Sequence, residues 1–420
     1  MQTRQYKRTK LACYASYFTM SSIFSLPPLL FVTLRETYGI SYTLLGTLVL
    51  TNFCTQLAVD LVFTLFTKYF NVKKVVRVMP LITTLGLVIY ALVPTLLPQY
   101  AYGGLLLGTV VFSVSAGLSE VLLSPVIAAI PSDTPQKDMS LLHSLFAFGV
   151  FTVVLVSTAF LKIFGTENWM YLTLFLAAWP VAASVLFFCS PMPDMDAGSG
   201  GKPVAERSRR KTLGLALCVG CIFFGSCAEN AMSSWVSGYM EAALRIPKAA
   251  GDILGMAGFA ILMGLTRISY ARWGKRIGPV LLIGMAGATV CYLLAGLSGS
   301  VVVAMMACIL TGMFTAMLWP GNLILMEENI PNAGVAAYAL MAAGGDLGAS
   351  IAPQLLGIVT DQVAAGSLAA KLAPQLQLTA EQIGMKAGML VTGLFPLAGT
   401  VLVLCALRFF KKRKVSPAQE

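Results

Sequence analysis

The chain has 420 residues, of which 57% are hydrophobic and only 11% are charged, and its formal net charge is +11. Soluble domains contain roughly 25% charged residues, so this composition excludes an ordinary soluble globular protein. It indicates instead a protein that lies largely within a membrane.

Apolar runs long enough to cross a bilayer recur along the whole chain. Because bilayer hydrocarbon cannot satisfy open backbone groups, each of these runs must be a helix. The sequence predicts an all-α membrane protein with twelve spans, at residues 11–34, 42–66, 76–96, 102–130, 139–161, 169–190, 212–238, 250–271, 278–298, 301–326, 333–359 and 385–408.

The basic residues lie mainly on one side of this predicted topology. With the N-terminus in the cytoplasm, 23 of the 29 Lys and Arg residues fall in cytoplasmic connections or at the cytoplasmic ends of spans. This is the positive-inside asymmetry, and it predicts an inner or plasma membrane protein with both termini in the cytoplasm. The positive charge therefore reflects topology, and we expect no nucleic-acid partner.

A single long polar segment divides the chain nearly in half. It follows the sixth span and contains Pro, Gly and charges of both signs, as a flexible linker does. We therefore predict an N-terminal six-helix bundle at 1–190, a cytoplasmic linker at 191–211 and a C-terminal six-helix bundle at 212–420.

The two halves share a spaced Gly–Pro pattern. Gly117 precedes Pro125 by eight residues in the fourth span, and Gly312 precedes Pro320 by eight residues in the tenth, 195 residues later. Chance coincidence is the alternative, since Gly and Pro are frequent in membrane helices. Equal span counts and a central linker favour a true duplication, with a binding site near the membrane midplane between the halves.

Several classes of function lack their usual residues. The chain has one His, and its nine Cys residues include only one C-x-x-C pair, Cys218 and Cys221, which lies on an apolar helix. We therefore predict no metal site, no cofactor and no enzyme activity. The G-x-x-x-x-G-K-[ST] loop that binds nucleotide phosphates is also absent from the sequence, which argues against ATP-driven transport.

Acidic residues at membrane depth are the strongest functional candidates. A charge there costs roughly 2.5–3.5 kcal/mol even on the most lenient scale, so each needs a reason. Glu120 lies in the middle of the fourth span, and its repeat equivalent is Thr315. We predict Glu120 as the proton-coupling residue; the alternative is a protonated Glu that only bonds to a neighbouring helix.

A second group of polar and aromatic residues could line a solute pathway. Mixed rings, amides and carboxylates suit a sugar or a related polyol, because rings stack on sugar faces and amides bond to hydroxyls. Hydrogen bonding between helices explains Asn and Ser about equally well. The predicted solute-binding set is Asn52, Gln56, Glu229, Asn230, Trp235, Trp319, Asn322 and Gln354.

Charged residues near span ends form a predicted gating set. Asp60 and Arg267 lie beside basic clusters at equivalent cytoplasmic positions. His143 lies at an interfacial helix end, where histidine is more often structural than a proton carrier. Asp346, among small residues in the eleventh span, either pairs with a cation or an Arg or serves a gate.

Short motifs resemble the major facilitator superfamily. Arg272-Trp273-Gly274-Lys275-Arg276 is similar to the R-x-G-R/K-R part of that family's signature, with Ala271 replacing the usual Asp. The segments GLSEVLLSPVIAAIP, LLHSLFAFGV and AENAMSSWVSGY resemble its fucose permease-like branch. The resemblance implies proton coupling through the fourth-helix Glu, which matches Glu120. The first-helix Asp of fucose permease has no equivalent here.

The predicted function is secondary active transport, with proton-coupled uptake of a sugar or another small polar metabolite by a monomer. The expected partners are the solute, protons and lipid. Proton-driven efflux of amphipathic compounds is an alternative, favoured by the 20 Met and 23 Phe residues. A membrane sensor on the same scaffold is another, but it would need a docking loop or an extra domain.

Overall fold

The computed structural model describes residues 6–66, 69–132, 135–193, 209–274, 276–330 and 334–414. Within these ranges, ten helices are long and apolar enough to cross a membrane. An eleventh passes the same test as a pair bent by 77°, Ala337–Ala365 with Ser367–Leu376, and a shorter apolar stretch runs over Phe148–Phe164. The predicted all-α membrane fold is confirmed, and these helices are consistent with twelve spans.

The chain packs as two compact units. Unit 1 is Met1–Ile40 with Thr51–Gly200, and unit 2 is Ser41–Leu50 with Gly201–Glu420. Most of the predicted linker, residues 194–208, lies outside the described residues. Ser41–Leu50, which lies in the first half of the chain, packs in unit 2.

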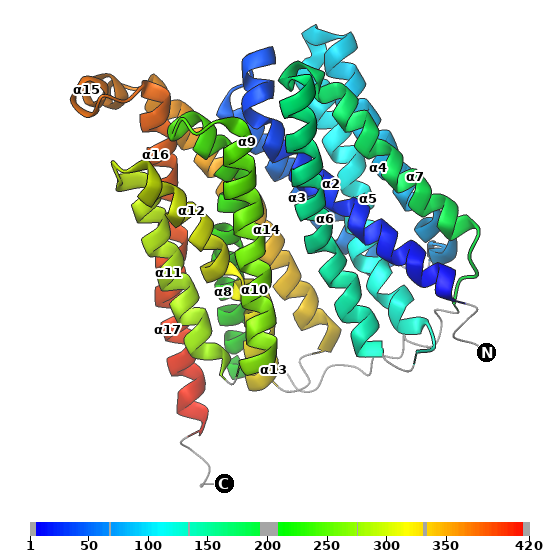
Figure 1. Ribbon diagram of the computed structural model, residues 1–420. Helices are drawn as coiled ribbons and strands as arrows, with labels where there is room; N and C mark the ends of the chain where they lie inside the picture. The colour runs from blue at the N-terminus through cyan, green and yellow to red at the C-terminus, as the bar shows by residue number, and fades with distance from the viewer. Residues whose placement is uncertain are drawn as a thin grey trace. The chain divides into compact units, whose positions relative to one another are not determined.

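The first six long helices are coloured blue to green in Figure 1, and they belong to unit 1 except for residues Ser41–Leu50. They are α2 (Lys7–Tyr38), α3 (Tyr42–Phe66), α4 (Val72–Leu96), α5 (Ala101–Ala129), α6 (Pro135–Phe164) and α7 (Trp169–Phe188), with short 3-10 turns η2 (Pro98–Tyr100) and η3 (Thr166–Asn168).

Glycine allows the helices of unit 1 to approach closely. A Cβ added at Gly86 of α4 would lie 2.5 Å from the backbone nitrogen of Phe112 on α5. One added at Gly108 of α5 would lie 2.7 Å from the backbone nitrogen of Tyr90 on α4. Small residues at facing positions are the usual means of close packing between membrane helices, because lipid provides no hydrophobic drive.

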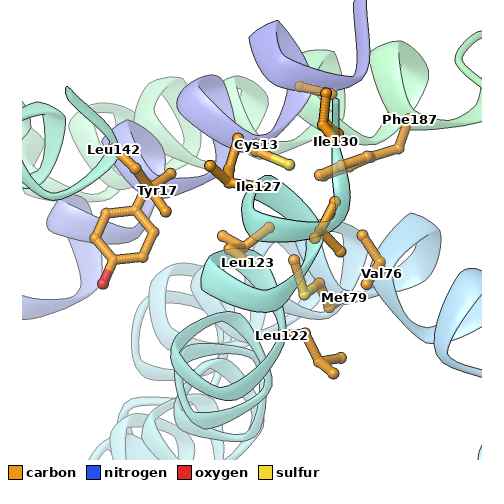
Figure 2. Packing of buried hydrophobic residues seen from close by; sticks show 12 residues of the cluster. Cys13, Tyr17, Val76, Met79, Leu122, Leu123, Ile127, Ile130, Leu142 and Phe187 are labelled. Carbon is orange, nitrogen blue, oxygen red and sulfur yellow. The ribbon is translucent and has the colours of Figure 1, made fainter. Parts of the chain in front are cut away.

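One apolar cluster joins α2, α4, α5, α6 and α7. Figure 2 shows Cys13 and Tyr17 of α2, Val76 and Met79 of α4, Leu123 of α5, Leu142 of α6 and Phe187 of α7 in this cluster. The Tyr17 ring lies at its margin, and the hydroxyl points away from the other labelled side chains. The Tyr17 hydroxyl therefore lies outside the apolar part of the cluster.

Unit 2 contains the remaining helices, coloured green to red in Figure 1, with α15 at the end away from the last turns of α17. They are α8 (Arg209–Gly238), α9 (Lys248–Ala250), α10 (Gly258–Trp273), α11 (Ile277–Leu297), α12 (Val301–Thr315), α13 (Leu318–Asn329), α14 (Gly334–Ala365), α15 (Ser367–Leu376), α16 (Ala380–Thr392) and α17 (Leu394–Lys414), with π-helical turns η5 (Tyr239–Ala243) and η6 (Gly251–Ala257).

A break at Ala316 and Met317 separates α12 from α13, shortly before Pro320. Proline has no N–H, so Pro320 cannot bond to the carbonyl four residues earlier, which is that of Ala316. Pro125, the equivalent residue of the first half, lies inside the unbroken helix α5. The repeated Gly–Pro pattern therefore produces a continuous helix in one unit and a broken one in the other.

Candidate functional site

A row of polar residues joins α3 to α5 within unit 1. The Asn52 amide oxygen accepts hydrogen bonds from the Ser113 hydroxyl at 2.6 Å and from the Gln56 amide nitrogen at 3.1 Å. Both amide side chains are buried. The two helices cross closely one turn further, where a Cβ on Gly117 would lie 3.0 Å from Cβ of Val59.

Two carboxyl groups follow this crossing. Asp60 lies one turn after Gln56 on α3, and Glu120 lies one turn after Gly117 on α5. Glu120 acts electrostatically on Asp60 and on Tyr17 of α2, the residue whose hydroxyl leaves the apolar cluster. Three helices of unit 1 therefore bring acidic and phenolic groups together.

The carboxyl pair has no cationic partner within the part of the chain that the structure describes. One oxygen of Asp60, Oδ1, is buried without a hydrogen-bond partner there. Glu120 is an exposed residue of α5. Two neighbouring carboxyl groups resist ionising together and tend to share a proton.

The sequence interpretation placed these two acids in different roles, with Glu120 in proton coupling and Asp60 in gating. The structure brings them together. A signal for this was present, since Asn52, Gln56 and Asp60 recur every four residues and therefore form one stripe on α3. Ser113 and Tyr17, the partners from α5 and α2, had no comparable signal.

Unit 2 holds an ion pair at the α12–α13 break. A guanidinium nitrogen of Arg267 on α10, Nη2, lies 3.5 Å from Oε1 of Glu229 on α8. The Arg267 Nε–H donates to the Ala316 carbonyl at 2.9 Å. Arg267 therefore satisfies the carbonyl that Pro320 leaves open, and Glu229 provides its countercharge.

Two acceptor oxygens of unit 2 lack hydrogen-bond donors. Oε2 of Glu229 and Oδ1 of Asn322 are buried and have no hydrogen-bond partner among the described residues. The Asn322 amide nitrogen donates to the Leu318 carbonyl, and the Asn230 amide nitrogen donates to the Ser226 hydroxyl. A buried acceptor without a donor is unfavourable, so these oxygens suit a ligand that supplies N–H or O–H groups.

Other predicted solute-binding residues lie elsewhere in unit 2. Trp235 is fully buried, and its indole N–H donates to the Pro353 carbonyl at 3.0 Å. Gln354 follows on α14, where its side-chain oxygen would lie 2.9 Å from a Cβ on Gly46 of α3. Both residues therefore lie beside the first turns of α3.

Three predicted site residues remain: Trp319, Asp346 and His143. The Trp319 ring packs on α14, where a Cβ on Gly345 would lie 2.2 Å from it. Asp346, the next residue of α14, is buried. The side chain of His143 lies outside the described residues. Within the described ranges, no group of three or more His, Cys, Asp or Glu residues could hold a metal ion.

The fold matches that of known transporters. The model of the Major Facilitator Superfamily matches residues 12–353. No curated protein matches the sequence. Among solved structures, a bacterial homologue of the human lysosomal transporter Spinster is 14% identical with a TM-score of 0.72, and all of both chains is covered.

Two proton symporters have similar structures. A D-xylose-proton symporter is 15% identical with a TM-score of 0.75, covering 93% of this chain and 97% of that one. The E. coli fucose:proton symporter is 14% identical with a TM-score of 0.58, covering 96% of this chain and 99% of that one. Likeness at these identities shows a shared fold.

Proposed function

Because the chain belongs to the Major Facilitator Superfamily, whose members are transporters of small solutes and not enzymes, we propose that it couples the uptake of a small polar solute to the movement of protons. The favoured solutes are sugars and related polyols. The multi-pass membrane fold is the basis of this proposal, and the clusters of the two units provide its chemistry.

The main support for the proposed proton coupling is the Asp60–Glu120 pair. A carboxylate at membrane depth is costly, and two adjacent ones are costlier still unless a proton neutralises them. The pair lacks a basic partner among the described residues, so a proton is the cation best suited to it. Loading and release of that proton would change the charge of unit 1 by one, which can bias a conformational equilibrium.

The polar cluster of unit 2 supports a hydroxylated solute. Glu229 and Asn322 offer buried acceptors, and Arg267 offers guanidinium donors with 43% of its side chain exposed. Adjacent hydroxyls of such a solute can donate to the oxygens of Glu229 and Asn322 and accept from the guanidinium group of Arg267. Because the Glu229–Arg267 pair is already neutral as a whole, a neutral solute adds no uncompensated charge.

The topology belongs to the same proposal. The asymmetric distribution of Lys and Arg supports a cytoplasmic membrane location with both termini in the cytoplasm. Under this orientation, solute and proton enter together from the outside. A monomer is sufficient, since each half supplies one cluster.

Transport by purified protein in liposomes tests the proposal. Uptake of labelled sugars and polyols is measured with and without an inward proton gradient, and solute counterflow is measured without one. We expect Glu120→Gln to abolish gradient-driven accumulation while it keeps counterflow, because the permanently neutral side chain cannot release a proton. Asp60→Asn should shift the pH dependence of accumulation.

Glu167→Gln is the matched control, because Glu167 is an exposed acid in the η3 turn. Full proton-driven accumulation by Glu120→Gln would disprove the coupling role. Movement of amphipathic compounds, with no sugar or polyol transported, would instead support the efflux alternative and reject the proposed solute class.

A further inference from the structure

The connection between the last two predicted spans contains a helix of its own, α15. Only Gly366 separates it from α14, and the two helices are bent by 77° relative to each other. Figure 1 shows α15 projecting sideways from unit 2, beside the ends of α14 and α16. Since membrane spans tilt on average by about 20° from the bilayer normal, a helix turned this far from α14 runs closer to the membrane plane than to its normal.

The far end of α15 is also tied to a span. Residues 377–379 lead from α15 to α16, which forms with α17 the span Ala380–Lys411. Gln377 ends α15 with a left-handed backbone at φ 53°, and the Leu378 N–H donates to the Ala373 carbonyl at 3.2 Å. Because so short a link covers only about 10 Å even when extended, α15 is held at the depth where two spans leave the hydrocarbon.

One side of α15 carries a stripe of leucines. Leu368, Leu372 and Leu376 recur every four residues and therefore follow one another along the same side of the helix. Leu368 is 53% exposed and Leu376 is 54% exposed. Ala369, which is fully buried, marks the side on which α15 packs against α14 and α16. The leucine stripe lies beside that packed side, and unit 2 covers it only in part.

The opposite side of α15 suits water. Ala370, Lys371 and Pro374 lie there, and all three are exposed. Proline has no N–H, so Pro374 removes the usual helical donor from the Ala370 carbonyl. An open carbonyl is unfavourable in hydrocarbon, which offers no water to bond to it. This side must therefore face water or lipid headgroups, whereas the leucine stripe offers them no polar group.

We propose that α15 is a membrane-surface helix, whose leucine stripe inserts among the lipids of the leaflet at this end of unit 2. Amphipathic helices of this type lie in the interface with their apolar face about 5–10 Å into the boundary between headgroups and acyl chains. Lipid is the occupant that the geometry favours, because the spans on both sides of α15 bring the bilayer to it. With both termini in the cytoplasm, this is the outer leaflet. The proposal rests on the membrane fold and not on protons or on a particular solute.

Spin labels on single cysteines test the surface helix without any transport assay. In a cysteine-free background, the label is placed by Leu368→Cys, Leu376→Cys or Ala370→Cys, and each protein is studied as one copy in a phosphatidylcholine nanodisc. Collisions with oxygen, which concentrates in hydrocarbon, are compared with collisions with a water-soluble nickel chelate. We expect the ratio of oxygen to nickel collisions to be several-fold higher at positions 368 and 376. Position 370 is the matched control, because it is an exposed residue on the other side of the same helix.

Hydrogen exchange tests whether lipid holds the helix in a chain that keeps its native cysteines. The double variant Leu368→Ser with Leu376→Ser should exchange the backbone amides of α15 about 10-fold faster than the parent in the same nanodiscs, because two half-exposed leucines lose their lipid contact. Ala370→Ser is the matched control, because it introduces the same side chain on the side that faces water, and it should exchange at the parent rate.

Several results would overturn the proposal. Nickel collisions as frequent at positions 368 and 376 as at 370 would place α15 in water. Labels at 368 and 376 that are shielded from both reagents would show that protein and not lipid covers the leucine stripe. Equal exchange rates in the double serine variant and in Ala370→Ser would show that the leucines do not hold the helix at the membrane. Should the cysteine-free chain fail to fold, the exchange measurement decides alone.

Discussion

The Glu229–Arg267 pair of unit 2 should couple measurably in a double-mutant cycle. The variants are Glu229→Gln, Arg267→Met and their combination. At the 3.5 Å separation of Oε1 and Nη2, two unit charges attract by about 5 kcal/mol at an effective dielectric constant of 20. Because 43% of the Arg267 side chain is exposed, solvent screening and desolvation reduce the net coupling to about 1–2 kcal/mol.

Arg267→Met should be the more damaging single change. It leaves Glu229 without its countercharge and the Ala316 carbonyl without its donor, which together should lower the unfolding free energy by about 2–4 kcal/mol. Glu229→Gln introduced on top of it should recover part of that loss, because no uncompensated carboxylate remains.

Unfolding in detergent, followed by intrinsic fluorescence, measures all four proteins at one pH. Arg272→Met is the control, because Arg272 lies near the end of the same helix and its side chain is exposed. A coupling energy within about 0.3 kcal/mol of zero, or an Arg267→Met protein as stable as Arg272→Met, would refute the reasoning.

Three further predictions concern other parts of the molecule. Gly86→Ala should destabilise unit 1 by about 1–3 kcal/mol in the same unfolding assay, because the new Cβ would lie 2.5 Å from the Phe112 backbone nitrogen. Gly103→Ala is the control: a Cβ there has no atom within 4 Å, so this change should be neutral or stabilising. Pro320→Ala should restore a backbone N–H that competes with Arg267 for the Ala316 carbonyl. We therefore expect higher thermal stability and slower counterflow, and faster counterflow would contradict the role of the break. Burial opposes ionisation of Asp138, but hydrogen bonds from Lys10 and Ser132 outweigh it and hold the pKa of that carboxyl below its ordinary value. The Lys10–Asp138 pair should therefore stabilise the fold by roughly 0.2–1 kcal/mol above pH 4, and this contribution should be lost as the pH falls through the lowered pKa. The difference in unfolding free energy between the parent and Lys10→Met should accordingly be constant from pH 5 to 8 and shrink below pH 4.

Helical spans could be predicted from the sequence because their formation depends on local composition. An apolar run of about 20 residues has one stable backbone form in hydrocarbon, whatever its neighbours are. The break before Pro320 also had a local cause, since a missing N–H acts only on the same helix. Glu120 was identified for a similar reason, because a lone acid in an apolar helix is unfavourable wherever it points.

Which side chains meet was decided only by tertiary structure. The pairing of Asp60 with Glu120 depends on the crossing of α3 and α5 at Gly117, and the placing of Trp235 and Gln354 depends on the approach of α3 to α14 at Gly46. The Asp361 carboxylate, which accepts a hydrogen bond from the Tyr42 N–H, joins residues 319 positions apart. Helix rotation and crossing are set by non-local packing of small residues, so composition and periodicity along one helix carry no information about the partner that it meets.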